Sequence, residues 1–400
     1  MNNINIAIAG NVDSGKSTLI GVLTNNKLDN GRGLARNLIL RNKHEKETGR
    51  TSTISLNYIR GKDKIYTLVD LAGHEKYLKT TMYGLTGMFI DYGIIVIGSN
   101  MGINKMTKEH IGIMLYLKIP FIIVVTKLDI CPQNVLNRTK TVIKKLLNLP
   151  LFNKKSYFIN NEKDLDNYFK IGNIETLIPI LSISNKTGQN LHQLRAVIDS
   201  LSYKERFMIE DDFGSLMYID SKFHVHGIGI VLAGTVKGNI KIGDRLWIGM
   251  IENRFIPIKV KSIHNNFSEN VKELTNGEYG CIAINFPTKD NFTKDQINKG
   301  VIAFNDDKFK KNIVNSFEAE IKVLHHSTTI KSNYRPMIHC GQVRQCAKLE
   351  LIDDNKFLRT GDNARVKFTF TKNPEYIEVG NTIFFRDGTT KGFGKVISLL

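Results

Sequence analysis

The first half of the chain alternates short apolar runs with longer mixed segments. The apolar runs lie within residues 4–10, 64–73, 92–100, 120–129 and 176–184, and the segment KSTLIGVLT after the first run is helical in pattern. Apolar strands separated by connections of helical length are typical of β/α units on a parallel sheet. We therefore expect an α/β domain over residues 1–204, with helices on both faces of a parallel-rich sheet.

The second half of the chain has a different rhythm. From Phe207 onward, short alternating runs such as KFHVHGIGIVLAGTVKG, IPIKVKSIH and ARVKFTFT are separated by Gly, Asn and Asp. This pattern favours antiparallel barrels or sandwiches. The polar stretch at 305–315 is a candidate linker, so we expect two all-β domains, residues 205–309 and 310–400. We place Trp247, within DRLWIG, in the core of the first.

The composition excludes several classes of protein. The 400 residues are 42% hydrophobic and 24% charged, which is close to globular averages and unlike a disordered, collagen-like or coiled-coil chain. No stretch approaches the roughly 20 apolar residues of a membrane span, and no secretory leader is evident. The four cysteines form no CxxC pair. We expect a soluble, cytoplasmic protein with no membrane partner, no disulfide framework and no zinc site.

The positive charge is unevenly distributed. Lys and Arg exceed Asp and Glu by 13 over residues 1–204 and by 6 over 310–400, whereas residues 205–309 have a net charge of −1. Two explanations stay open, an anionic partner such as RNA or the coding bias of an AT-rich genome. The near-neutral charge of residues 205–309 favours an anionic partner, because a coding bias should add positive charge to all three parts of the chain equally.

The strongest motif follows the first apolar strand and precedes the helical run. It has the form GxxxxGK[ST], in which glycines let backbone N–H groups wrap phosphate oxygens, the lysine reaches the outer phosphates, and the hydroxyl ligates Mg²⁺. The expected nucleotide-binding residues are Gly10, Asn11, Val12, Asp13, Ser14, Gly15, Lys16, Ser17 and Thr18.

Two further segments indicate a guanine base. Asp129, in Thr126-Lys127-Leu128-Asp129, can accept from the two adjacent N–H groups of guanine, whereas adenine offers no such pair. We expect Lys127 to lie along the base and to tie this loop to the phosphate loop. The segment Ser184-Asn185-Lys186 would complete the base site, so the motifs predict GTP and GDP as ligands.

A third group of residues suits a reaction at the outer phosphate. Asp70 can hold Mg²⁺ through water, the Gly73 N–H can contact the γ-phosphate, and His74 can orient the attacking water. Upstream, Thr51 supplies a magnesium hydroxyl, with Thr53 as the open alternative. The predicted catalytic residues are Lys16, Gly73 and His74, and the predicted metal residues are Ser17, Thr51 and Asp70.

With these motifs in place, the chain resembles the translational GTPases of the elongation factor Tu and eukaryotic elongation factor 1α type, and most closely the GTP-binding protein 1 and 2 subfamily. The likeness rests on GNVDSGKST, LDNGRGLAR, DLAGHEKYLKTT and TKLDICP, and later on FEAEIKVLHHSTTI and MIHCGQVRQCA. It implies a P-loop G domain followed by two β-barrels. It also implies a monovalent cation near Asp13.

One departure from the family pattern concerns the gate that restrains the catalytic histidine in elongation factor Tu. An apolar residue forms one side of that gate, and here the position is Arg50, so that Val12 would face a charged partner.

The resemblance and the motifs together predict a monomeric GTPase of the translation apparatus that binds aminoacyl-tRNA and acts on the ribosome. The alternative is an adaptor in ribosome rescue or mRNA turnover, in which GTP sets the shape of a docking surface.

Overall fold

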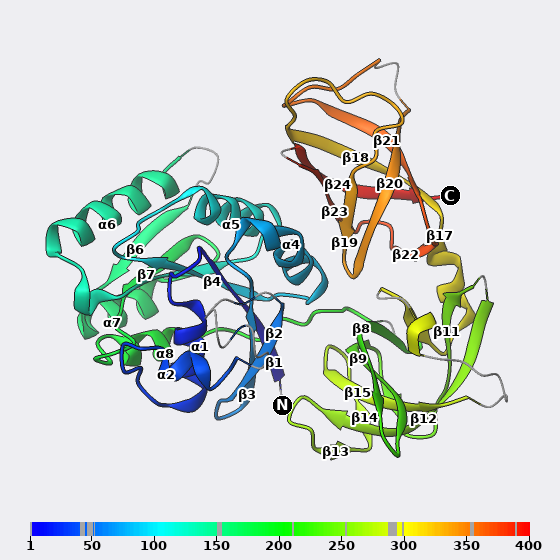
Figure 1. Ribbon diagram of the computed structural model, residues 1–400, viewed down its shortest axis with the longest axis horizontal. Coiled ribbons are helices and arrows are strands. Elements are labelled where there is room, and N and C mark those ends of the chain that lie inside the picture. The colour runs from blue at the N-terminus through cyan, green and yellow to red at the C-terminus, as the bar shows by residue number, and fades with distance from the viewer. Residues whose placement is uncertain are drawn as a thin grey trace. The chain divides into compact units, whose positions relative to one another are not determined.

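The chain separates into two compact units, Met1–Lys204 and Glu205–Leu400 (Figure 1). The computed structural model describes residues 2–40, 45, 51, 53–149, 154–209, 212–252, 254–286, 294–297, 300–352, 356–388 and 390–400. Within these ranges, no helix is long and apolar enough to cross a bilayer. The two units are described separately below.

The first unit is built on a seven-stranded sheet of order β2-β3-β1-β4-β5-β7-β6. Every neighbouring pair is parallel except β2 and β3. The central strands β4 and β5 are buried along their whole length, as the continuous apolar runs of parallel strands require. The strands are β1 (Asn2–Gly10), β2 (Ser55–Arg60), β3 (Lys64–Asp70), β4 (Tyr92–Gly98), β5 (Phe121–Thr126), β6 (Lys155–Ile159) and β7 (Leu177–Ser182).

Helices cover both faces of this sheet (Figure 1). One core cluster joins the sheet to α1 (Lys16–Asn25), α2 (Leu34–Asn37), α7 (Glu162–Ile171) and α8 (Leu191–Asp199). The other helices are α4 (Leu78–Gly87), α5 (Lys105–Tyr116) and α6 (Gln133–Leu147), with short 3-10 turns η1 (Glu75–Tyr77) and η2 (Leu128–Ile130). The α/β prediction for this half is confirmed.

The second unit opens with an antiparallel barrel that closes where β11 pairs with β12. Its alternating positions fill a core of aliphatic side chains such as Ile248, Ile258 and Ile282. Its strands are β8 (Leu216–Val225), β9 (Gly229–Lys237), β11 (Arg245–Ile251), β12 (Arg254–Asn265), β13 (Asn270–Val271), β15 (Tyr279–Asn285) and β16 (Ile302–Phe304), with a separate pair β10 (Ile240–Lys241) and β14 (Glu273–Leu274).

A second closed barrel follows, of order β18-β21-β20-β19-β23-β24. Its core contains the packed rings of Phe317 and Phe368, whose centroids are 5.5 Å apart. Its strands are β18 (Ser316–His325), β19 (Met337–Cys340), β20 (Val343–Leu351), β21 (Asn363–Phe370), β23 (Thr382–Asp387) and β24 (Thr390–Leu399), beside a short pair β17 (Ile313–Val314) and β22 (Glu375–Tyr376). Of the two all-β architectures left open by the sequence, the structure selects barrels.

Two local predictions are wrong. Trp247 is 37% exposed, because on β11 it alternates with the buried Leu246 and Ile248 and so points outward, where the Lys310 ammonium lies 5.1 Å from its ring centroid. The expected linker at 305–315 is a structured segment. It forms the 3-10 turn η4 (Asp307–Asn312) with Phe309 buried, and then β17. The division at 309/310 stays a prediction.

The packing of α1 on α2 gives a stability prediction. A Cβ on Gly21 of α1 would lie 2.6 Å from the Ala35 carbonyl carbon of α2, closer than any real contact. Gly21→Ala should therefore lower the free energy of unfolding by about 1–3 kcal/mol, in spite of alanine's better helix propensity.

Gly112 in α5 is the matched control, because a Cβ there would meet no atom within 4 Å. Gly112→Ala should raise stability by about 0.5–1 kcal/mol. Urea denaturation of both variants measures the difference, and a Gly21→Ala protein as stable as Gly112→Ala would contradict the packing.

Candidate functional site

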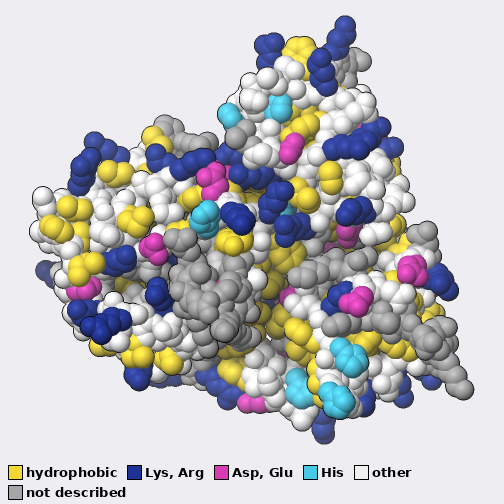
Figure 2. All heavy atoms as spheres, viewed as in Figure 1, with side chains coloured by type: hydrophobic (Ala, Val, Ile, Leu, Met, Phe, Trp, Pro, Cys, Tyr) yellow, Lys and Arg dark blue, Asp and Glu magenta, His cyan; other side chains and the backbone are white. Residues whose placement is uncertain are grey.

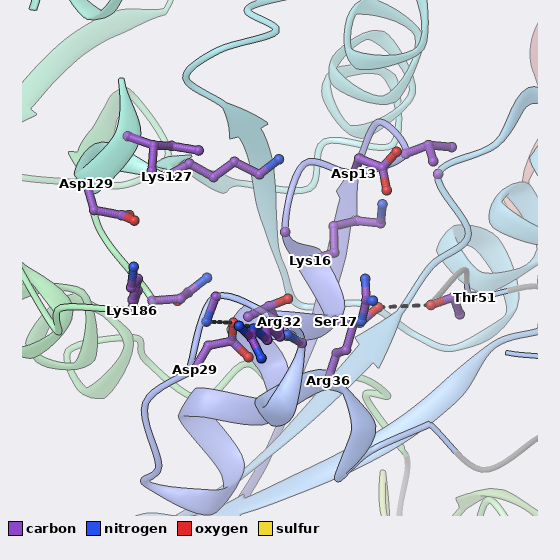
Figure 3. A pocket seen from close by; sticks show the side chains of 18 of the residues that line it. Asp13, Lys16, Ser17, Asp29, Arg32, Arg36, Thr51, Lys127, Asp129 and Lys186 are labelled. Atoms are coloured by element: carbon purple, nitrogen blue, oxygen red, sulfur yellow. Dashed lines mark hydrogen bonds between the residues drawn. The ribbon is translucent and has the colours of Figure 1, made fainter. Parts of the chain in front are cut away.

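A cavity of about 520 Å³ opens at the carboxyl edge of the parallel strands in the first unit (Figure 3). Its walls come from the loops that follow β1, β3, β5 and β7, and from the loop between α1 and α2. Ligand sites in open α/β sheets lie at this edge, because successive loops meet there. The cavity therefore gathers segments that are far apart in the sequence.

The loop from Gly10 to Lys16 wraps the inner end of the cavity. Its backbone has positive φ at Gly10 (151°), Asp13 (58°) and Gly15 (90°), and a Cβ at Gly10 would collide with the Val96 carbonyl. Positive φ at successive turns of this kind is typical of backbone loops that bind anions. The glycines of the motif are therefore required by backbone geometry.

Lys16 lies buried on the floor of this cradle. Its Nζ donates to the Asn11 carbonyl at 2.7 Å. Burial lowers the pKa of Lys16 to about 8, against the opposing effect of the Asp70 and Asp13 carboxylates. Gly73 packs so closely on this group that a Cβ would lie 2.5 Å from the Lys16 Nζ. A residue larger than glycine at position 73 would displace the lysine.

Three oxygen side chains meet beside Lys16. The Ser17 Oγ lies 2.9 Å from both the Thr51 Oγ1 and the Asp70 Oδ2, and Thr51 donates to the same Asp70 oxygen at 3.0 Å. Burial raises the pKa of Asp70, while Lys16, Ser17 and Thr51 act to lower it. The Asp70 Oδ1 is buried and has no hydrogen-bond partner in the described part of the chain.

This oxygen-only donor set fits Mg²⁺, a hard cation that prefers carboxylate and hydroxyl ligands. It also distinguishes the two threonine candidates. Thr53 is exposed, and its N–H and Oγ1 both donate to the Glu45 carboxylate at 3.4 Å, whereas the Thr51 hydroxyl bonds Ser17 and Asp70. The geometry favours Thr51.

The loops after β5 and β7 form the opposite end of the cavity. Asp129 accepts a hydrogen bond of 2.6 Å from the Ser184 Oγ, which in turn accepts from the N–H groups of Lys186 and Thr187. The Thr126 hydroxyl donates to the Ser14 carbonyl at 2.6 Å. This bond ties the base loop to the phosphate loop, the role that the sequence suggested for Lys127, whose side chain lines the cavity.

His74 lies at the mouth of the cavity. It is exposed and caps η1, where its Nδ1 accepts from the Lys76 N–H at 3.1 Å, and its ring meets Tyr77 edge-on with centroids 6.2 Å apart. Because Nδ1 is an acceptor, the ring carries its proton on Nε2 in this arrangement. Val12 also lines the cavity, whereas Arg50 lies outside the described residues.

Sequence reasoning missed one wall of the cavity. The loop between α1 and α2, together with α2, contributes the lining residues Asp29, Gly31, Arg32, Gly33 and Arg36. The segment LDNGRGLAR carried the family resemblance but was not among the predicted site residues. Its signal was the Asx and glycine turn chemistry together with two arginines close in sequence to a single aspartate, Asp29. In the described ranges, no cluster of three or more His, Cys, Asp or Glu side chains could hold another metal ion.

Comparison with known proteins identifies the type of domain. The sequence profile of the elongation factor Tu GTP binding domain matches residues 1–204. GTP-binding protein 1 of Xenopus laevis is 40% identical over 99% of this chain, and GTP-binding protein 2 of Homo sapiens is 35% identical over 98%. The chain spans 63% and 69% of the lengths of these relatives, respectively.

A solved structure supports the fold. Translation elongation factor SelB from Methanococcus maripaludis, in complex with a GTP analogue, superposes with a TM-score of 0.73 at 22% identity, and the match covers all of this chain and 80% of that one. At this identity the likeness shows the fold, a G domain followed by two barrels.

The assignment of Asp129 to base recognition gives the next prediction. Asp129→Asn should shift preference from guanine toward xanthine, because an amide presents a donor and an acceptor to the xanthine N–H and carbonyl. A loss of about 10⁴-fold in GDP affinity is expected, judged from sites built to hydrogen-bond a ligand.

Competition binding with GDP and XDP measures this change, and Asp166→Asn, an exposed position on α7, is the control. If Asp129→Asn and the parent protein bind GDP with equal affinity, the assignment of Asp129 to base recognition is wrong.

Proposed function

The chain belongs to the translational GTPases that carry the elongation factor Tu GTP-binding domain, and from that premise we propose that it hydrolyses GTP to GDP and phosphate, binding aminoacyl-tRNA and acting on the ribosome. The observation that carries the hydrolytic part is the gathering of a base loop, a phosphate cradle, a three-oxygen cluster and His74 around one cavity.

The two ends of the cavity divide the work of binding GTP. Asp129 accepts from the guanine N–H groups, while the backbone of Gly10 to Ser17 and the Lys16 ammonium bind the phosphates. Phosphoryl transfer needs positioning and charge neutralisation more than covalent chemistry. Mg²⁺ held by Ser17, Thr51 and Asp70 would neutralise charge on the outer phosphates.

Gly73 and His74 serve the reacting end. Gly73 lies close to Lys16 because it has no side chain, and we assign its N–H to the γ-phosphate. His74 donates from Nε2–H to the oxygen of the attacking water and so orients it in line with the γ-phosphorus. Because His74 is exposed at the mouth, a partner that changes the position of η1 changes the position of this water.

The proposal includes a monovalent cation near Asp13. Asp13 lines the cavity in a left-handed backbone conformation, and its carboxylate acts on the nearby Lys16 charge. We also expect the protein to be a cytoplasmic monomer.

Two observations support an RNA partner. Named elongation factors are among the relatives, including the selenocysteine-specific elongation factor of Methanocaldococcus jannaschii, 28% identical over 81% of this chain. Lys and Arg exceed acidic residues by 13 in residues 1–204, and Figure 2 shows these side chains spread over the visible face of that unit. A surface of this charge suits a phosphate backbone.

The role of His74 predicts a separation of binding from turnover. His74→Ala should leave GTP affinity nearly intact and lower ribosome-stimulated hydrolysis by about 10²- to 10⁴-fold, because the nucleophile loses its position. Phosphate release and equilibrium nucleotide binding are measured side by side. The control is His192→Ala, an exposed histidine on α8. If the His74→Ala variant retains ribosome-stimulated GTP hydrolysis, His74 has a structural role and does not position the water.

The RNA proposal predicts a steep salt dependence. Each neutralised phosphate contributes a slope of about −0.7 to −0.9 to the logarithm of affinity against the logarithm of salt. With about five such contacts, the affinity for RNA should fall by one to two orders of magnitude over a few-fold rise in salt concentration. The GTP-bound form should bind aminoacyl-tRNA more tightly than the GDP-bound form.

Reversal of the exposed Lys79 and Lys108 to Glu should flatten the slope, whereas reversal of Lys259 and Lys261 on β12 should matter less. A flat response with no dependence on nucleotide would reject tRNA as the partner and favour the adaptor role.

A further inference from the structure

The loop between α1 and α2 is held rigidly at the nucleotide cavity. The Asp29 carboxylate accepts from the N–H groups of Gly31 (2.8 Å), Gly33 (3.4 Å) and Ala35 (2.9 Å). The Asn30 Oδ1 accepts from Arg32 N–H at 2.8 Å. The positive φ of Gly31 (82°) and Gly33 (89°) lets the chain fold around Asp29. These hydrogen bonds fix the backbone of the loop and therefore the Cα positions from which its side chains extend.

The same loop is joined to both ends of the nucleotide site. The Asp29 N–H donates to the Asn185 carbonyl at 2.9 Å, which links it to the base loop, and Gly31 lies beside the Lys186 side chain. At its other end, Ala35 packs on Gly21 of α1, the helix that begins at Lys16. The loop therefore connects the base loop at Asn185 and Lys186 with the helix that follows the phosphate-binding loop.

Two guanidinium groups project from this span. Arg36 folds back over Gly33, where a Cβ would lie 2.9 Å from the Arg36 Cζ, so glycine at position 33 leaves the space that the arginine occupies. The Arg36 Nε is buried and has no hydrogen-bond partner among the residues described. Figure 3 shows Arg32 between Lys186 and Ser17, and Arg36 directed toward Ser17.

Two carboxylates that line the cavity are already engaged. Asp29 is occupied by three backbone N–H groups, and Asp129 accepts from Ser184. In the part of the chain that the structure describes, neither arginine forms an ion pair within 4.0 Å with a carboxylate. A buried donor beside the phosphate cradle, with no protein acceptor, points to an acceptor on the ligand.

We propose that Arg36 and Arg32 bind the diphosphate that GTP and GDP share, from the side of the cavity opposite Lys127. The inference rests on the proposed function, since it assigns two further contacts to the same ligand. The loop that precedes the arginines is bonded to the base loop through Asp29 and Asn185, whereas Gly73 is assigned to the γ-phosphate, so the pair recognises both nucleotide states. Guanidinium groups suit this task because their fork matches paired phosphate oxygens.

The test measures Kd for fluorescent GTP and GDP derivatives in the presence of Mg²⁺ with the full chain. Arg36→Ala and Arg32→Ala should each raise Kd by about tenfold, by the same factor for GTP and GDP, since each removes a charge-assisted hydrogen bond. Arg36→Lys should recover part of the loss, because it keeps the charge without the fork.

Arg138→Ala is the matched control, since it removes an equal charge from an exposed position on α6. Thermal unfolding confirms that each variant is folded. Unchanged Kd values in both alanine variants would overturn the inference alone. A loss confined to GTP, or to the rate of hydrolysis, would also overturn it and assign the arginines to the γ-phosphate. Failure of the wild-type protein to bind guanine nucleotides would instead overturn the proposed function.

Discussion

The nucleotide site depends on a carboxylate buried at the end of β3. Asp70 is fully inaccessible to solvent, and burying an ionised group is costly unless other groups compensate. The compensation comes from Lys16, Ser17 and Thr51, which belong to two other segments of the chain. The need to satisfy one carboxylate therefore brings together the phosphate loop, its helix and the segment that contains Thr51.

A second constraint links the ends of the cavity. The Thr126–Ser14 bond joins the loop after β5 to the phosphate-binding loop at residues 10–16. The Asp29–Asn185 bond joins the loop between α1 and α2 to the loop after β7. The first bond uses the Thr126 side-chain hydroxyl, whereas the second joins two backbone groups and does not depend on the side chains of Asp29 and Asn185. Because the cavity walls are already ordered, binding a ligand there costs less conformational entropy.

The sequence predicted the parts of the site that are local in the chain. The phosphate loop and Asp129 each follow an apolar strand at a fixed spacing, so backbone geometry constrains them directly. Tertiary packing decided the rest. Trp247 has a hydrophobic side chain but occupies the outward position of β11, Phe309 draws the expected linker into the fold, and Arg36 reaches the cavity only because α2 packs on Gly21.

The measurement that tests the account most directly is equilibrium competition between GDP and ADP for the wild-type protein in the presence of Mg²⁺. If Asp129 accepts from two guanine N–H groups that adenine lacks, as we propose, GDP should bind at least about 10³-fold more tightly than ADP. Equal affinity for the two nucleotides, or no binding of either, would contradict the assignment of this cavity to a guanine nucleotide.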